Sequence, residues 1–77
     1  MAKIRMTRLM FEEYAHAKKF ADTYTTADDI YDYWVTPVIV DGYNYALAAK
    51  GSIAGISKIE DEYIKFMQQG RGKACIM

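Results

Sequence analysis

Two hydrophobic periods follow each other at the start of the chain. Over residues 2 to 6 apolar and basic residues alternate, which is the period of a short, half-buried strand. Over residues 10 to 21 apolar side chains recur every three or four positions, with charged residues between them, as in an amphipathic helix. We therefore predict an N-terminal strand, a cap at Thr7 and a helix over about residues 8 to 23.

The start signals of a second helix lie in the middle of the chain. Thr26 stands three residues before Asp29, a variant of the capping box. Asp28 and Asp29 would then occupy the first turn, where carboxylates face unpaired N–H groups. Pro37 disfavours any continuation of that helix. The predicted helix would bury Ile30, Tyr33 and Trp34.

A hairpin is predicted after the proline. The segment is β-branched up to Asp41 and Gly42, and an Asp-Gly pair is a strong signal for a two-residue turn. We expect strands near 37 to 40 and 43 to 48. This turn would pair Val40 with Tyr43 and Val38 with Tyr45.

Residues 43 to 50 also fit a helix. Their alanines and leucine favour helical structure, and Gly51 would suit the position after its end. Strand and helix both remain open for this segment.

A last helix is indicated by a full capping box. Ser57 and Glu60 have the S-x-x-E spacing, and Gly70 is a stop signal. Residues 51 to 57 are then a flexible connection, and residues 72 to 77 can add a terminal strand. The apolar stripe of this helix would be Ile59, Tyr63, Phe66 and Met67.

Together these elements predict one α+β domain over residues 1 to 77. It would have about three helices and a short antiparallel sheet, in the order β-α-α-β-β-α-β. A chain of 77 residues buries only about 60% of the surface that its unfolded form exposes. A thin core of this kind makes a deep catalytic pocket hard to build.

Composition points to a folded cytoplasmic protein. Hydrophobic residues make up 52% of the chain, and the ten basic residues balance the ten acidic ones, so no overall field attracts nucleic acid or an anionic membrane. The single cysteine, Cys75, rules out an internal disulfide framework. No apolar run reaches the length of a signal peptide or of a membrane span.

Motifs for metal and cofactor binding are incomplete. Asp28, Asp29 and Asp32 have the D-D-x-x-D spacing that can hold magnesium against a diphosphate, but that chemistry needs a large cavity and a second acidic motif. Glu13 and His16 share a helix face, yet a di-iron site needs two such pairs, and His16 is the only histidine. We expect no metal site and no cofactor.

Catalytic and nucleotide-binding patterns are also missing. The glycines at 51 and 55 are not followed by the lysine and hydroxyl residue of a phosphate-binding loop. A Cys75–His16 dyad would lack a third group to orient the imidazole. We therefore expect no catalytic residues, and the predicted protein is not an enzyme.

The charges and tyrosines are unevenly distributed. No lysine or arginine occurs between Phe20 and Ala49, and the five aspartates of that segment give it a charge of minus five. Tyrosine is a frequent interface anchor, because its ring is large and carries a polar tip. The predicted partner-binding residues are Asp28, Asp29, Tyr31, Asp32, Tyr43 and Tyr45. The competing interpretation makes these rings part of the core and these carboxylates part of a solvated surface.

A basic patch is the second candidate. Basic residues stand near both chain ends, and they would converge into a phosphate-binding site if the terminal strands were neighbours. These residues are Lys3, Arg5, Arg8, Arg71 and Lys73.

A non-enzymatic binding module is the function that these patterns favour. We expect a small accessory or inhibitory regulator, of the kind that phages and mobile elements encode, which docks on a larger protein. The alternative is a small nucleic-acid-binding regulator that uses the basic ends. The sequence favours neither a monomer nor an oligomer.

Overall fold

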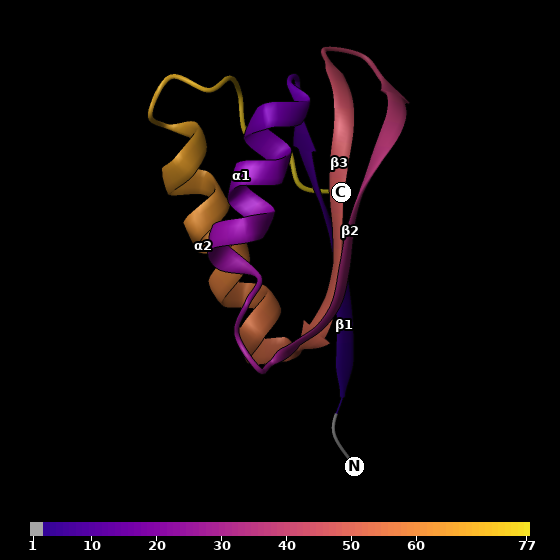
Figure 1. The fold of residues 1–77 in the computed structure, drawn as a ribbon, viewed down its shortest axis with the longest axis vertical. Coiled ribbons are helices and arrows are strands. Elements are labelled where there is room, and N and C mark those ends of the chain that lie inside the picture. The colour runs from indigo at the N-terminus through magenta and orange to yellow at the C-terminus, as the bar shows by residue number, and fades with distance from the viewer. Residues whose placement is uncertain (1–2) are drawn as a thin grey trace.

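The computed structural model describes residues 3–77 and has an α+β architecture, as predicted. Its three strands form one antiparallel sheet in the order β1-β3-β2, and both helices lie on the same side of that sheet (Figure 1). The described residues contain two helices rather than about three. The elements are β1 (Ile4–Phe11), α1 (Tyr14–Tyr24), β2 (Ile30–Val40), β3 (Tyr43–Ser52) and α2 (Ile53–Met67).

The core fills the space between the two helices and the inner face of the sheet. Aromatic rings dominate its centre: the ring of Phe11 lies 5.2 Å from that of Tyr63 and 6.0 Å from that of Phe20, centroid to centroid. Such tilted and edge-on contacts suit the charge distribution of aromatic rings. The other buried members are Leu9, Ala17, Ala21, Ile30, Leu47, Ala49, Ile56, Ile59, Phe66 and Met67.

The first strand is longer than predicted, and the first helix is shorter. β1 extends to Phe11, so the segment from Arg8 to Phe11 is strand and not helix. Thr7 is not a helix cap: it lies within β1, and its hydroxyl donates to Glu60 Oε2 at 2.7 Å. Strand pairing makes this segment a strand rather than a helix, because every residue from Ile4 to Phe11 has a partner on β3. Ala2 lies outside the described residues.

The predicted second helix is wrong, because residues 30–40 form the strand β2. Its β-branched and aromatic residues favour a pleated, half-buried surface. Asp28 and Asp29 belong to a turn instead, in which the N–H of Ile30 donates to the carbonyl of Ala27 at 3.1 Å. The acidic helix start therefore does not exist.

The predicted hairpin is confirmed at its turn. Val40 pairs with Tyr43, and Gly42 has a φ of 85°, which glycine adopts without strain. The second predicted pair is wrong, because a bulge between Pro37 and Val40 places Pro37, and not Val38, opposite Tyr45. β3 continues to Ser52, which also excludes the alternative helix over residues 43 to 50.

A second irregularity lies at the start of β2. Ile30 pairs with Gly51 and Asp32 pairs with Lys50, so Tyr31 is an extra residue without a partner. Gly51 permits this, because a Cβ at that position would collide with the backbone carbonyl of Asp29. That same carbonyl accepts a hydrogen bond from the N–H of Ser52 at 2.9 Å.

Helix α2 begins five residues earlier than predicted. Its N-cap is Ser52, whose hydroxyl accepts from the N–H of Gly55 at 2.9 Å. Residues 51 to 57 are therefore the end of β3 and the first turns of a helix rather than a flexible connection. The predicted apolar stripe of this helix is buried as expected.

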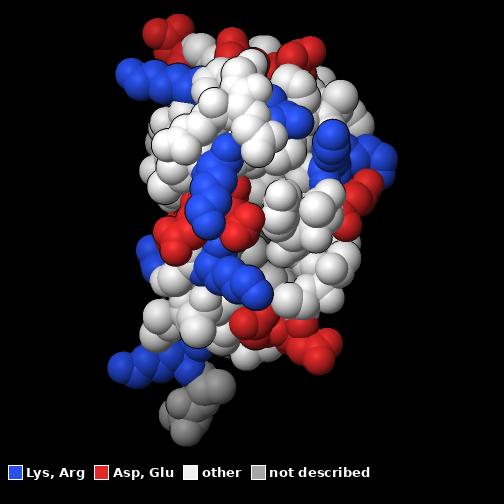
Figure 2. Space-filling view, turned by 90° about the vertical axis from the view of Figure 1, so that its left-hand side faces the viewer, with Lys and Arg blue, Asp and Glu red and all other residues white. Residues whose placement is uncertain are grey.

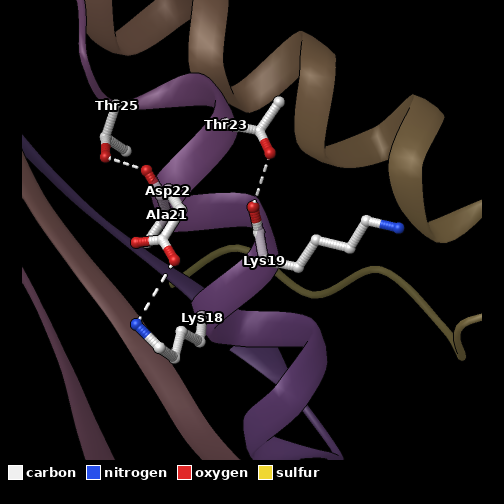
Figure 3. Close-up of polar contacts among 6 residues, drawn as sticks. All are labelled: Lys18, Lys19, Ala21, Asp22, Thr23 and Thr25. Atoms are coloured by element: carbon white, nitrogen blue, oxygen red, sulfur yellow. Dashed lines mark hydrogen bonds and ion pairs between the residues drawn. The ribbon is translucent and has the colours of Figure 1, made fainter.

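Helix α1 ends in a set of local contacts (Figure 3). Lys18 lies 3.3 Å from Asp22 in an i, i+4 ion pair, and the hydroxyl of Thr23 donates to the carbonyl of Lys19 at 2.7 Å. The hydroxyl of the buried Thr25 donates to the carbonyl of Ala21. The carbonyl of Ala21 also accepts the N–H of Thr25, at 3.3 Å.

The C-terminal segment lies along the outer edge of β1. It forms a single bridge, between Ile76 and Leu9, rather than a full strand. The hydroxyl of Tyr63 joins this contact from α2, since it donates to the carbonyl of Met10 at 2.5 Å and accepts from the N–H of Cys75 at 3.0 Å.

Candidate functional site

The hydrogen bonds of β1, at the opposite edge of the sheet, determine the side to which the backbone N–H and C=O groups of β2 point. On β1, the N–H groups of Arg8 and Met10 donate to the C-terminal segment at 3.1 and 3.0 Å. The groups of Leu9, between them, therefore point to β3, because successive residues of a strand point to opposite sides. Leu9 is opposite Leu47. The backbone groups of Leu47 thus bond to β1, and those of its neighbour Ala48 bond to β2.

The same alternation identifies the free groups of β2. Ala48 is opposite Trp34, so the backbone groups of Trp34 are used within the sheet. Those of Tyr33 and Val35, on either side, point away from β3 to the outer edge. One contact agrees with this: the N–H of Tyr33 donates to the carboxylate of Asp32, at 2.9 Å. The outer edge of β2 thus carries backbone groups that no strand in the described part of the chain pairs.

Three large aromatic side chains are exposed along this edge. The exposed fractions are 52% for Tyr31, 40% for Tyr33 and 43% for Trp34. Tyr31 is the unpaired residue of the bulge, and bulges commonly redirect a side chain. Trp34 lies on the sheet face opposite the helices, because its partner Ala48 is not part of the core between helices and sheet. Aromatic area of this extent is typical of interface anchors.

Two exposed carboxylates flank these rings. Asp28 lies in the turn before β2 and Asp32 lies within the strand; both are exposed. We call Asp28, Tyr31, Asp32, Tyr33 and Trp34 the aromatic edge. It unites three of the six predicted partner-binding residues with two that were predicted to be buried by a helix.

Asp29 has a different position from its neighbours. Its carboxylate packs against the first turn of α2, where the Cβ of a residue replacing Gly55 would lie 2.8 Å from its Cγ. The carboxylate is half-buried there, close to the positive end of the helix. Asp29 therefore has a structural contact rather than a place in the aromatic edge.

Tyr43 and Tyr45 lie at the other end of the sheet. Tyr43 donates from its hydroxyl to the carbonyl of Lys73 at 2.7 Å, and burial, followed by the nearby Cys75 and Glu12, raises the pKa of its phenol. The ring of Tyr45 packs edge-on against Tyr14 at 5.4 Å. Tyr45 is opposite Pro37, which is six residues, or about 20 Å, along β2 from Tyr31. The six predicted residues do not form one face.

Tyr33 and Trp34 were not predicted to be surface residues, because their segment has the start signals of a helix. The signal that could have found them is the run of aromatic and β-branched residues from Tyr31 to Thr36, which favours a strand. In a strand, Tyr33 and Trp34 must point to opposite faces, so at least one leaves the core.

The predicted basic residues do not converge. The C-terminal segment does lie beside β1, but it runs antiparallel, with Met77 beside Arg8. Lys73 therefore approaches Glu12 and Asp41, with which it lines a hollow, and it lies about 20 Å along the strand from Arg5.

Two members of that set have other contacts. Arg5 pairs with Glu60 at 3.2 Å. Arg71 stacks on Phe66 at 4.1 Å from the ring centre and donates to the backbone carbonyl of Phe66 at 3.2 Å. Lys3 and Arg8 are exposed. The helix-covered side of the molecule likewise shows cations and carboxylates interspersed rather than a basic field (Figure 2).

Hollows on the surface include four with volumes of about 210, 320, 430 and 700 Å³. The one at the end of α1 has a volume of about 320 Å³ and is lined by Tyr24, Ile30, Ile59 and charged residues, including Asp29 and Lys58. This is the lower limit of ligand pockets. Among residues 3–77 no group of three or more histidine, cysteine, aspartate or glutamate side chains is arranged to hold a metal ion.

His16 and Cys75, the two residues of the possible catalytic dyad, lie in different surroundings. Its Nδ1 lies 3.6 Å from Glu13 Oε2, and its ring packs edge-on against Phe66 at 6.5 Å. Cys75 is held instead beside Tyr63, at the edge of β1.

Two further observations complete the description. Neither helix in the described part of the chain is long and apolar enough to cross a membrane. No known protein family, curated protein or solved structure matches this chain.

Proposed function

We propose that this chain is a non-enzymatic protein-binding module, a small accessory or inhibitory regulator that docks on a larger protein through the aromatic edge. The observation that carries the proposal is the exposure of Tyr31, Tyr33 and Trp34 on a strand whose outer edge pairs with no other strand among residues 3–77. Tyrosine and tryptophan are enriched among the residues that dominate binding energy, because each buries a large rigid surface at low entropic cost.

Charge and aromatic residues have separate roles in this proposal. The exposed Asp28 and Asp32 attract a partner with a basic surface and so raise the association rate. The rings are buried on contact and so slow dissociation.

The proposal is tested by site-specific photo-crosslinking in cells that naturally carry the gene. A photoreactive phenylalanine analogue replaces Tyr31, and the matched control carries it at Tyr14. These two tyrosines have nearly equal exposure, 52% and 51%, but Tyr14 lies on α1 beside Tyr45. We expect one protein to crosslink from position 31 and not from position 14.

The affinity of the purified partner is then measured with alanine variants. We expect Trp34→Ala to weaken binding by about 2 kcal/mol or more, as at a hot spot, whereas Tyr14→Ala changes it little. Crosslinking from position 14 alone, or full affinity in folded Trp34→Ala and Tyr31→Ala variants, would show that the aromatic edge is not the binding site.

The nucleic-acid alternative keeps a direct test. A regulator that uses the basic ends would bind DNA or RNA with a steep salt dependence, because phosphate contacts release counterions. Neutralising Arg5, Arg71 and Lys73 would abolish that binding and leave protein docking intact. The structure supports this alternative less, because Arg5 and Lys73 lie about 20 Å apart and because Arg5 and Arg71 bond to other groups of the protein.

A further inference from the structure

The outer edge of β2 is a short, defined template for another strand. The bulge at Tyr31 ends regular pairing on one side, and Pro37, which has no N–H, ends it on the other. Between them the outward groups are the N–H and C=O of Tyr33 and Val35, because the groups of Trp34 bond to β3. Residues 32 to 36 span about 17 Å, so an added strand would pair over about five residues.

Asp32 covers one of these groups. Its carboxylate accepts the N–H of Tyr33 at 2.9 Å, and both residues are exposed. A strand pairing at Tyr33 must displace this carboxylate, which then needs another partner. A lysine or arginine side chain on the incoming strand provides one, because a charge-assisted bond is stronger than the bond that is lost.

The surrounding charge also favours a basic strand. From residue 25 to residue 42 the chain has four aspartates and no lysine or arginine. The nearest cation in register is Lys50, opposite Asp32 on β3, yet no ion pair joins these two among the described residues. Two copies of this chain would bring like charges together at the edge, and such pairs disfavour edge-to-edge association.

We propose that the partner binds by strand addition: an extended, lysine- or arginine-bearing segment pairs with the backbone of β2 at Tyr33 and Val35, and its cation draws Asp32 off the Tyr33 N–H. This inference rests on the proposed function and extends it to the conformation and charge of the partner's segment. The exposed rings of Tyr33 and Trp34 then flank the added strand on its two faces.

A designed peptide tests the pairing without knowledge of the natural partner. The probe is a seven-residue peptide of alternating lysine and valine, and its control has glutamate in place of lysine. In an NMR titration of the labelled protein, we expect the amide signals of Tyr33 and Val35 to shift with the lysine peptide. Binding should be at least about tenfold tighter than with the glutamate peptide, which corresponds to about 1.4 kcal/mol. Equal binding of both peptides, or no shift at these two amides, would overturn the proposal.

Two methylated peptides distinguish strand pairing from side-chain docking. One is N-methylated at the odd positions and the other at the even positions, so only one of them blocks the N–H groups that face β2. We expect one peptide to lose binding and the other to keep it. If both bind alike, the segment docks through its side chains, and strand addition is wrong.

A pair of protein variants tests the role of Asp32. Asp32→Ala and Asp28→Ala each remove one exposed carboxylate, but only the first removes the acceptor of the Tyr33 N–H. We expect faster hydrogen exchange at the Tyr33 amide and a smaller preference for lysine over glutamate in Asp32→Ala, and neither change in Asp28→Ala. Equal effects of the two variants would show that Asp32 acts only through general charge.

The results of these experiments distinguish strand addition from docking at the aromatic edge by other contacts. If Trp34→Ala abolishes partner binding while both methylated peptides bind alike, the aromatic edge is the docking site but strand addition is wrong. If the Tyr33 and Val35 signals shift with protein concentration in the absence of peptide, a second copy occupies the edge, which also overturns the inference.

Discussion

The hydroxyl of Tyr63 donates to the backbone carbonyl of Met10 at 2.5 Å. It also accepts the N–H of Cys75 at 3.0 Å, so one side chain of α2 joins the edge of β1 to the C-terminal segment. Because Met10 and the Tyr63 side chain are both buried, the carbonyl of Met10 has no water as a substitute partner. A buried phenol therefore fixes the chain end.

Replacing Tyr63 with phenylalanine should destabilise the protein by about 1 to 3 kcal/mol, because the buried carbonyl of Met10 loses its donor. Chemical denaturation measures the change, and hydrogen exchange at Cys75 should quicken. The control is Tyr43→Phe, which removes a more exposed hydroxyl bonded to the carbonyl of Lys73. A loss in Tyr43→Phe equal to that in Tyr63→Phe would contradict the role given to burial.

Alkaline pH should destabilise the fold through the same residue. Burial, the largest cause, raises the pKa of Tyr63 from 10.0 to about 12. In the unfolded chain this phenol ionises near its ordinary pKa, so its contribution to stability is complete below pH 10 and is lost as pH rises towards 12. The slope is at most about 1.4 kcal/mol per pH unit for one group.

Denaturation curves between pH 9 and pH 12 measure this slope, and Tyr63→Phe is the control because it cannot ionise there. We expect a shallower decline in the variant. Identical pH profiles in the two proteins would show that other groups cause the alkaline loss.

The cap of α2 should be energetically detectable. Ser52→Ala removes the acceptor of the Gly55 N–H and should cost about 0.5 to 2 kcal/mol. Ser57, which has the capping-box spacing in the sequence, lies within the helix, so Ser57→Ala should change stability by less than about 0.5 kcal/mol. The opposite order of the two effects would place the helix start at Ser57.

Gly51→Ala should destabilise the protein by about 1 to 3 kcal/mol, because the new methyl group would overlap the carbonyl of Asp29. The backbone must then move apart at the bulge, and the N–H of Ser52 loses its acceptor. Thermal unfolding and hydrogen exchange at Ser52 report both effects. An unchanged melting temperature with a protected Ser52 amide would show that the two strands are not so close.

Magnesium at millimolar concentration should leave the melting temperature unchanged. The three carboxylates of the D-D-x-x-D spacing are used differently: Asp28 is exposed, Asp29 packs against Gly55, and Asp32 accepts the N–H of Tyr33. A metal bound to the folded state would raise the melting temperature by mass action. A saturable rise that Asp28→Asn removes would reveal a site.

Local signals in the sequence located several features correctly. The Asp-Gly pair at 41–42 predicted the hairpin turn, because the left-handed backbone of that turn selects for glycine. The spacing of Ile59, Tyr63 and Phe66 predicted the buried stripe of α2. These features depend on residues within one or two turns of each other, so the sequence by itself contains the information. The α+β class follows from the same local patterns.

Features that depend on distant residues came only from the tertiary structure. Residues 26 to 36 have the start signals of a helix, but eight of the eleven residues of β2 gain partners on β3, and packing in a sheet overrides weak local preferences. Because this segment is a strand and not a helix, Tyr33 and Trp34 lie at an exposed edge rather than in a core. For the same reason Tyr31 lies far from Tyr45. Which face of a strand is covered depends on where both helices dock (Figure 1). Ala17 of α1 and Ile56 of α2, which are far apart in the chain, belong to the same core. The sequence determined most of the local elements, and the non-local pairing of the strands decided which residues form the surface.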